Sequence, residues 1–260
     1  ELDYLKENGF DISLIKVSPK AHVVFNSHIE DDCKKYGSQG TTKRGIAPCY
    51  RDKYGRIGRR ICDLSMEELN EYNLDTSIIW NEKIFGTILC EGAQGFWLDI
   101  NYGNYPYVTS SSTLPYSACS LGFSPKEIRN IYGAAKIYDT RSGTDPLFPE
   151  ALHDNSELSS VGELGGEFGT TTGRKRKVNW LNLDKLIIAT KISGTTHAII
   201  SKVDVIDKLK LFKYYYNNTL VTVDTFTEMK KNIEAILFKN CVNLSEIKFS
   251  NNTENIDMNL

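Results

Sequence analysis

This chain of 260 residues lacks the sequence features of several protein classes. No apolar run reaches the roughly 20 residues that cross a membrane, and the first residues, ELDYLK, do not resemble a signal peptide. The six cysteines are scattered without a C-x-x-C pair, which disfavours a disulfide framework or a zinc site. The formal net charge is only −2, so the chain has no overall attraction to nucleic acid or to an anionic membrane. We therefore expect a cytoplasmic protein with free thiols and with neither a nucleic-acid nor a membrane partner.

The chain also lacks a Walker phosphate loop, although one segment shares much of its chemistry. Residues 166–180 read GEFGTTTGRKRKVNW, without the Gly-Lys-Ser/Thr ending of that loop. Gly169 and Gly173 let the backbone approach a ligand closely, and threonine hydroxyls can donate to anionic oxygens. Arg174 and Arg176 offer planar guanidinium groups suited to carboxylate or phosphate. The segment predicts a site for a small anion; the alternative is an exposed basic turn, the usual explanation of a bare run of cations.

Hydrophobic patterns predict alternating helices and strands. Short apolar runs predict buried strands at residues 84–89 and 196–201, and longer periodic segments predict helices at residues 183–191 and 227–238. The chain is long enough for a substantial core, and it shows no repeat or low-complexity linker. We therefore expect a single α/β domain over residues 1–260, with a central, largely parallel sheet flanked by helices.

Six short motifs then occur in an order that resembles a known family. They are G-T-T-K-R-G-I-A-P at residues 40–48, E-G-A-Q-G at 91–95, Y-P-Y-V-T-S-S at 105–111, T-R-S-G at 140–143, T-T-G-R-K-R at 171–176 and S-K-V-D at 201–204. Together they resemble the adenylosuccinate synthetase family, ligases of purine nucleotide biosynthesis that join IMP to L-aspartate using GTP and release GDP and phosphate. Several matches in one order over most of the chain are far more specific than any single motif. The resemblance implies a sheet similar to that of P-loop NTPases.

The resemblance also implies a set of binding residues, position by position. They are Thr42, Arg56, Gln94, Thr109 and Arg174 for IMP, Thr171, Thr172, Arg174 and Arg176 for L-aspartate, and Arg176, Lys202, Asp204 and Ser250 for GTP. An Asp204 carboxylate can accept from guanine N1–H and from the exocyclic amine, a pattern that adenine does not offer. Taken singly, most of these residues would more often be caps, loop residues or surface charges, and the order of the motifs favours binding.

Arg56 carries an implication for assembly. It ends the segment R-D-K-Y-G-R at residues 51–56, and the resemblance implies that this arginine reaches across a two-fold interface into the IMP site of a partner subunit. The functional unit would then be a homodimer. The alternative is a solvated surface arginine.

The family's G-D-E-G-K-G-K loop, whose aspartate is the catalytic base and a magnesium ligand, has no match here, and none of the four histidines occupies the context of the family's general acid. We therefore predict no catalytic or metal-binding residue in this chain and expect the Mg²⁺ ligands in an N-terminal segment outside it, so that the chain alone is incomplete for catalysis. The short segment between residues 64 and 91 keeps open a phage-type 2-aminoadenylosuccinate synthetase that acts on dGMP. A non-catalytic nucleotide-binding remnant is a further alternative. At residues 249–256 the family's Gly-Pro turn beneath the guanine is missing.

Overall fold

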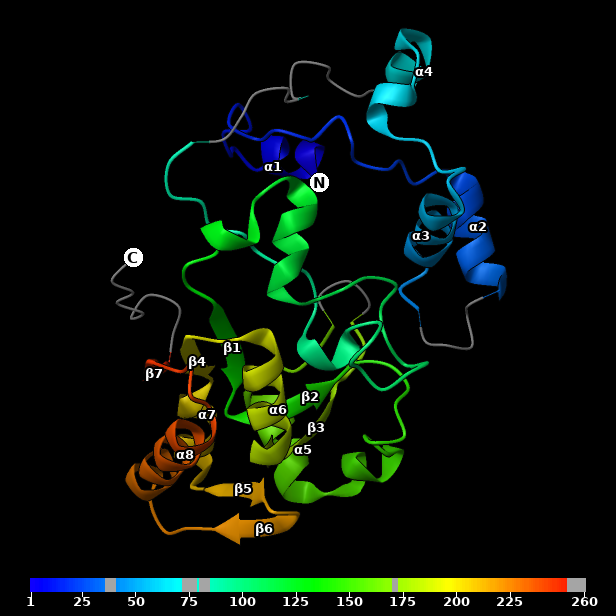
Figure 1. The fold of residues 1–260 in the computed structure, drawn as a ribbon. Helices are drawn as coiled ribbons and strands as arrows, with labels where there is room; N and C mark the ends of the chain where they lie inside the picture. Colours follow the sequence, from blue (N-terminus) through cyan, green and yellow to red (C-terminus); the bar gives the residue numbers. More distant parts are fainter. Residues whose placement is uncertain (36–40, 72–78, 80–84, 170–172, 252–260) are drawn as a thin grey trace. The chain divides into compact units, whose positions relative to one another are not determined.

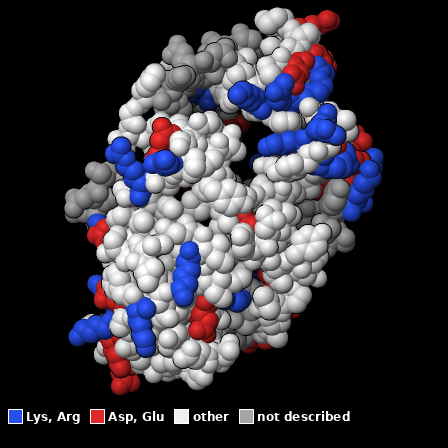
Figure 2. All heavy atoms as spheres, viewed as in Figure 1, with Lys and Arg blue, Asp and Glu red and all other residues white. Residues whose placement is uncertain are grey.

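The computed structural model describes residues 1–35, 41–71, 79, 85–169 and 173–251. The chain divides into two compact units, Glu1–Glu91 and Gly92–Leu260, and each is described by itself (Figure 1). None of the described helices combines the length and the apolar character that crossing a membrane requires. Figure 2 shows basic and acidic side chains scattered over the visible face, with uncharged side chains covering much of it.

The first unit is built from short helices. They are α1 (Leu2–Glu7), α2 (Asn26–Lys35), α3 (Ile46–Gly55), the 3-10 turn η2 (Ile61–Asp63) and α4 (Met66–Glu71), and α2 packs on α3. The buried carboxylate of Asp32 fixes the loop before α3, because its Oδ2 accepts from the backbone N–H of Gly45 at 2.8 Å and from Thr41 Oγ1 at 3.1 Å. Gly45 has a φ of 75°, and a Cβ there would lie 2.9 Å from the backbone nitrogen of Ile29. Only glycine therefore fits this turn.

The second unit contains two sheets. β1 (Tyr132–Lys136), β4 (His197–Ser201) and β7 (Glu246–Phe249) pair in parallel in the order β1-β4-β7. β2 (Tyr138–Arg141), β3 (Lys177–Asn182), β5 (Lys213–Tyr216) and β6 (Thr219–Thr222) form a mixed sheet in the order β2-β3-β5-β6, in which only β3 and β5 are parallel. The strand predicted at residues 196–201 is therefore confirmed as β4, the centre of the parallel sheet.

Helices flank these sheets. They are α5 (Ser156–Leu164), α6 (Leu183–Ser193), α7 (Val203–Leu209) and α8 (Phe226–Asn240), with the 3-10 turns η4 (Phe96–Leu98), η5 (Pro115–Leu121), η6 (Pro125–Glu127) and η7 (Glu150–Asp154). The helices predicted at residues 183–191 and 227–238 are confirmed as α6 and α8. Side-chain caps start both of them: the Asn182 oxygen accepts from the backbone N–H of Lys185, and Thr225 Oγ1 accepts from that of Glu228.

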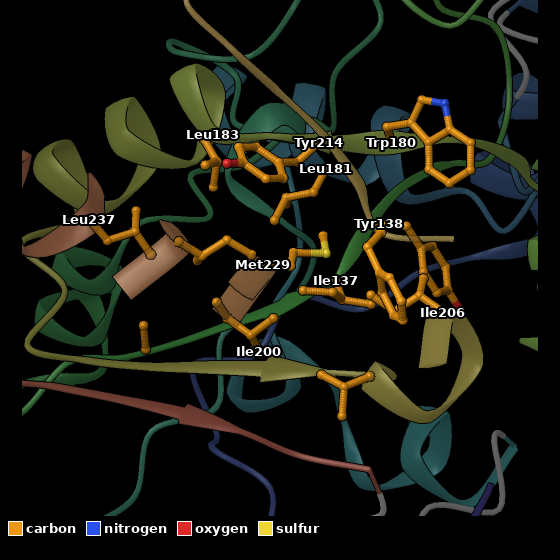
Figure 3. Packing of buried hydrophobic residues seen from close by; sticks show 14 of the residues in the cluster. Ile137, Tyr138, Trp180, Leu181, Leu183, Ile200, Ile206, Tyr214, Met229 and Leu237 are labelled. Carbon is orange, nitrogen blue, oxygen red and sulfur yellow. The ribbon is translucent and has the colours of Figure 1, made fainter. Parts of the chain in front are cut away.

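The core of the second unit lies between α8, α6 and the sheets. Met229, Ile233 and Leu237 recur every four residues along α8 and are fully buried, in one cluster with Leu183 of α6 and Ile200 of β4 (Figure 3). Burial of each such side chain stabilises the fold by roughly 1.5–3 kcal/mol. This cluster supports the carboxyl ends of the strands, where ligands bind in open α/β sheets.

The strand predicted at residues 84–89 is wrong for its described part. Residues 85–89 form no strand, and the side chains of Phe85 and Leu89 are 86% and 72% exposed. A strand needs a paired neighbour for its backbone N–H and C=O groups, and none of the described segments pairs with these residues. The E-G-A-Q-G motif consequently does not follow a sheet strand.

Candidate functional site

The carboxyl ends of two parallel strands bring the predicted guanine-binding residues together. β4 is followed directly by Lys202 and by Asp204 in the first turn of α7, and β7 is followed by Ser250. The backbone N–H of Ser250 donates to the carbonyl of Ile200 at 2.9 Å, and that of Val203 donates to the carbonyl of Ser250 at 3.4 Å. Ser250 is buried, whereas Asp204 is only partly covered. The strand ends thus present one carboxylate and one ammonium group beside a buried serine.

Glu167 carries a buried carboxylate. It lies directly before the loop at residues 168–176, which contains the T-T-G-R-K-R motif and is hereafter the basic loop. Its Oε1 accepts from Tyr138 Oη at 2.8 Å, and its Oε2 accepts from Lys136 Nζ at 2.7 Å and from Arg176 Nη1 at 3.0 Å. Burial alone would raise the pKa of Glu167, but the hydrogen bonds from Lys136 and Tyr138 hold that pKa below its ordinary value. Glu167 is therefore an ionised anchor that fixes the position of the Arg176 guanidinium group.

The segment just before Glu167 also reaches the guanine-binding residues. Lys202 Nζ donates to the carbonyl oxygen of Gly165 at 3.0 Å, two residues before Glu167. Burial, and then the neighbouring Glu167 carboxylate, raise the pKa of Tyr138 well above its ordinary range, so its hydroxyl remains a donor. The short segment from Gly165 to Glu167 thus holds both Lys202 and Arg176 by hydrogen bonds.

Backbone hydrogen bonds join the two sides of the basic loop at its base. The backbone N–H of Arg176 donates to the carbonyl of Glu167 at 2.9 Å, and that of Gly169 donates to the carbonyl of Arg174 at 2.8 Å. Arg176 lies at this base. Arg174, two residues earlier in the loop, is exposed. Thr171 and Thr172, which complete the predicted aspartate-binding set, lie outside the described residues.

A cavity of about 360 Å³ opens in the second unit. Its polar and aromatic lining comes from Gln94, Phe96, Trp97, Asn104, Asp139, Thr140, Arg141, Ser142, Asp145, Phe148, Arg176 and Lys185. The cavity therefore unites two predicted binding residues, Gln94 and Arg176, with the T-R-S-G motif. Its size lies within the range of small-molecule sites, roughly 300–1,000 Å³.

One wall of the cavity is pinned by a buried ion pair. Arg141 Nε lies 3.4 Å from Asp145 Oδ2, and Arg141 Nη2 donates to the carbonyl of Tyr107. Asp145 Oδ1 accepts from Asn104 Nδ2 at 2.7 Å and from the backbone N–H of Leu147 at 2.9 Å. This arginine thus links the Y-P-Y-V-T-S-S segment to the T-R-S-G motif.

The cavity lining includes two further charged residues that sequence reasoning missed, Asp139 and Lys185. Asp139 shares one face of β2 with Arg141, since side chains alternate along a strand, and its carboxylate accepts from the backbone N–H of Asn182. Burial raises the pKa of Asp139 to about 7, against the opposing charge of Lys185. Lys185 Nζ lies 5.7 Å from the ring centroid of Trp97 and 5.4 Å from that of Phe148. The sequence feature that could have indicated Asp139 is its place as an acidic residue directly before the T-R-S-G motif.

Asp99 is a further buried residue that was not predicted. Its carboxylate accepts from Ser112 Oγ at 2.8 Å and from the backbone N–H groups of Thr113 and Asn101 at 2.7 and 2.9 Å. Burial alone would raise the pKa of Asp99, but these hydrogen bonds lower it. Thr109, a predicted IMP-binding residue, is placed by the same folded segment, because its backbone N–H donates to the carbonyl of Leu98 at 2.8 Å.

Three predicted site residues have a left-handed backbone. Arg56, Gln94 and Lys202 have φ values of 62°, 72° and 63°, a region that residues other than glycine rarely adopt and that recurs at functional sites. Arg56 follows the last residue of α3, and both Arg56 and Thr42 are exposed in the first unit. Of the predicted residues in the second unit, Gln94 and Arg176 line the cavity, and Lys202, Asp204 and Ser250 lie at the strand ends.

No group of three or more His, Cys, Asp or Glu side chains within the described part of the chain is placed to hold a metal ion.

The sequence matches the family model described as adenylosuccinate synthetase over residues 1–87 and 65–238. The adenylosuccinate synthetase of a Thermoanaerobacter species is 32% identical over 275 residues, covering 85% of this chain and 64% of that protein. That of Cytophaga hutchinsonii is 36% identical over 279 residues, covering 86% of this chain and 64% of that protein. The chain thus spans about 64% of the length of these relatives.

Two solved structures share the fold. The fully ligated adenylosuccinate synthetase of Plasmodium falciparum superimposes with a TM-score of 0.68 at 24% identity, over 95% of this chain and 78% of that chain. The succinoaminodeoxyadenylate synthetase of cyanophage S-2L, bound to dGMP and dATP, superimposes with a TM-score of 0.54 at 17% identity, over 86% of this chain and 72% of that chain. The predicted α/β fold is confirmed by these likenesses. Since the family model matches nearly the whole sequence, the chain belongs to the adenylosuccinate synthetase family.

Proposed function

We propose that this protein acts in purine nucleotide biosynthesis, in the GTP-dependent ligation of IMP and L-aspartate to adenylosuccinate with release of GDP and phosphate. The observation that carries the proposal is the connection between two sets of residues in the second unit. Lys202 at the strand ends bonds the Gly165 carbonyl, and Arg176 in the cavity bonds the Glu167 carboxylate two residues further along the chain. A ligase that joins IMP to aspartate at the expense of GTP needs adjacent binding regions for GTP and for the ligated substrates.

The chain's own residues bind and orient the substrates. Asp204, Lys202 and Ser250 bind the guanine, and Asp204 accepts from its N1–H and exocyclic amine. The two carboxylates of aspartate require paired cations, which Arg174 and Arg176 supply.

The remaining assignments complete this proposal. Thr171 and Thr172 contribute hydroxyl groups to aspartate, and Thr42, Gln94, Thr109 and Arg174 bind IMP. Phosphorylation of the IMP 6-oxygen and its displacement by the aspartate amine require a base and an acid, and no described residue is assigned either role. The two compact units serve together as one synthetase domain in the cytoplasm.

Guanine selectivity tests the proposal. Calorimetric titration of the 260-residue chain with GTP, ATP, IMP and dGMP should show binding of GTP and IMP, with GTP preferred over ATP by at least tenfold. Equal affinity for ATP and GTP would remove the assigned role of Asp204. Binding of dGMP in place of IMP would instead indicate the reaction of the cyanophage relative. Formation of adenylosuccinate by the whole protein encoded by its gene completes the test.

Subunit mixing tests the assigned role of Arg56. We propose that the enzyme is a homodimer in which Arg56 completes the partner's IMP site, as its exposure at the end of α3 permits. In the whole protein encoded by the gene, mixing an Arg56→Ala form with an Arg176→Ala form should then restore part of the activity, because one site in the mixed dimer is intact. Failure of rescue in a mixture shown to exchange subunits would place Arg56 outside the partner's site.

A further inference from the structure

The charged groups around the cavity are unequally paired. Arg141 is paired with Asp145 at 3.4 Å, and Arg176 with Glu167 at 3.0 Å. On β3, which pairs with β2, Lys177 is held by Glu150 at 2.8 Å. Among the described charged residues that line the cavity, Asp139 and Lys185 are the two without a direct ion pair. Protonation of Asp139 therefore changes the net charge of the cavity beside Lys185.

Lys185 is held in place by its surroundings. It lies in the first turn of α6, and its ammonium group faces the rings of Trp97 and Phe148 at 5.7 and 5.4 Å from their centroids. An aromatic face stabilises a cation without neutralising its charge. Asp139 faces the same cavity from β2, and the charges of the two groups act on each other through space. When Asp139 is ionised the pair sums to zero, and when it is protonated the charge of Lys185 is left uncompensated.

We propose that an anionic ligand of this cavity binds together with a proton that Asp139 takes up. The inference rests on the proposed function, which supplies the ligand class: a phosphate or carboxylate group of a substrate. An ionised Asp139 repels such a group across the cavity, whereas a protonated Asp139 leaves Lys185 to attract it. By linkage, the anion raises the proton affinity of Asp139 as much as the proton raises the affinity for the anion.

The pKa of Asp139, raised to about 7 by burial, makes this coupling effective near neutral pH. Below that pKa Asp139 is already protonated, so the affinity for an anion no longer depends on its titration. Above it, a proton must be taken up for each anion bound, and the affinity falls by up to about tenfold for each pH unit.

Calorimetry with IMP measures the proton directly. IMP is titrated into the protein at pH 8, where its phosphate is fully ionised (its second pKa is about 6), in two buffers of different protonation enthalpy. We expect uptake of a substantial fraction of one proton by the unmodified protein and none by Asp139→Asn. The control Asp207→Asn removes a carboxylate on α7 that lies outside the cavity and is paired with Lys210, and it should take up as much as the unmodified protein. Equal uptake by the unmodified protein and Asp139→Asn would overturn the inference.

A second measurement needs neither a variant nor the proposed function. The carboxyl-carbon NMR signal of Asp139 is titrated with pH in the unmodified protein, with and without IMP, and with and without inorganic phosphate. Either anion should move the midpoint to higher pH. If IMP fails to bind and inorganic phosphate still moves the midpoint, the proposed function fails and the proton coupling stands. If neither anion moves the midpoint, the proton coupling is overturned, whatever the calorimetry of GTP and IMP shows.

Discussion

Glu167 and Asp139 are two enclosed carboxyl groups of the same unit that have opposite electrostatic environments. Glu167 is 2% exposed and receives hydrogen bonds from Lys136, Tyr138 and Arg176, and its pKa lies below the ordinary value. Asp139 receives one backbone N–H and faces a cavity, and its pKa is raised to about 7. Burial raises the pKa in both cases, so the difference comes from the number of donors. Enclosure alone therefore does not indicate whether a carboxyl group is an anchor or a titrating group.

The two carboxyl groups therefore suit different roles. The Glu167 region keeps one charge state and one geometry, which suits a group that positions Arg176. The Asp139 region changes its charge within the physiological range, which suits a group that responds to a ligand. The following experiments test this contrast.

The largest loss of stability is expected from Glu167→Gln. The substitution leaves Lys136 and Arg176 without their shared carboxylate, and removal of one partner of a buried ion pair typically costs about 3–5 kcal/mol. Since both cations are partly exposed, we expect a loss of about 3 kcal/mol in the free energy of unfolding, measured by urea denaturation at pH 7. Glu163→Gln, which changes an exposed carboxylate paired with Lys175, should have little effect. Similar stabilities for the two variants would show that Glu167 is not an anchor.

Asp139→Asn should raise the free energy of unfolding at neutral and alkaline pH, whereas Glu167→Gln lowers it. In the unmodified protein, the raised pKa of Asp139 gives stability that is complete below the unfolded-state pKa of about 4 and is lost as the pH rises to about 7. Asparagine does not titrate. Between pH 4 and pH 8, the free energy of unfolding of the variant should therefore rise by up to about 4 kcal/mol relative to that of the unmodified protein. Urea denaturation at the two pH values measures this change. A constant difference between variant and unmodified protein would mean that Asp139 titrates normally.

Asp204→Asn tests a third carboxylate, which is only partly covered and has a loose ion pair with Lys208 at 3.5 Å. The amide offers a donor where guanine needs an acceptor, so GTP affinity should fall by about 1.5–3 kcal/mol. XTP should be relatively favoured, because its 2-oxo group can accept from that amide. Competition binding with GTP and XTP measures both effects, and an equal loss for the two nucleotides would show that Asp204 does not contact the base.

The smallest expected effect is that of Lys185→Gln on the titration of Asp139. The charge of Lys185 lowers the pKa of Asp139 against the effect of burial, so its removal should raise the NMR midpoint by up to about one pH unit, which corresponds to roughly 1.4 kcal/mol. An unchanged midpoint would indicate that the two charges do not interact.

The sequence predicted those elements that local patterns specify. The strand β4 that precedes the S-K-V-D segment and the helices α6 and α8 follow from patterns within a few residues, and Arg176 lines the cavity, while the ligands assigned to these residues stay predictions. Asp139 and Lys185 could not be predicted, because their relation depends on the pairing of β2 with β3 and on the rings of Trp97 and Phe148. The strand predicted at residues 84–89 was wrong for a similar reason, since an apolar run does not show whether a partner strand exists.

The left-handed residues Arg56, Gln94 and Lys202 matter for anyone who wishes to make this protein more heat-resistant. Glycine adopts such a backbone without the steric cost of a Cβ, which is on the order of 1–2 kcal/mol per residue. A search for stabilising substitutions that scores the folded chain alone would therefore select all three for replacement by glycine. Each replacement would discard a side chain assigned to a ligand, so stability and binding are in direct conflict at these positions. Thermostability design should leave them unchanged and turn to sites remote from the ligands.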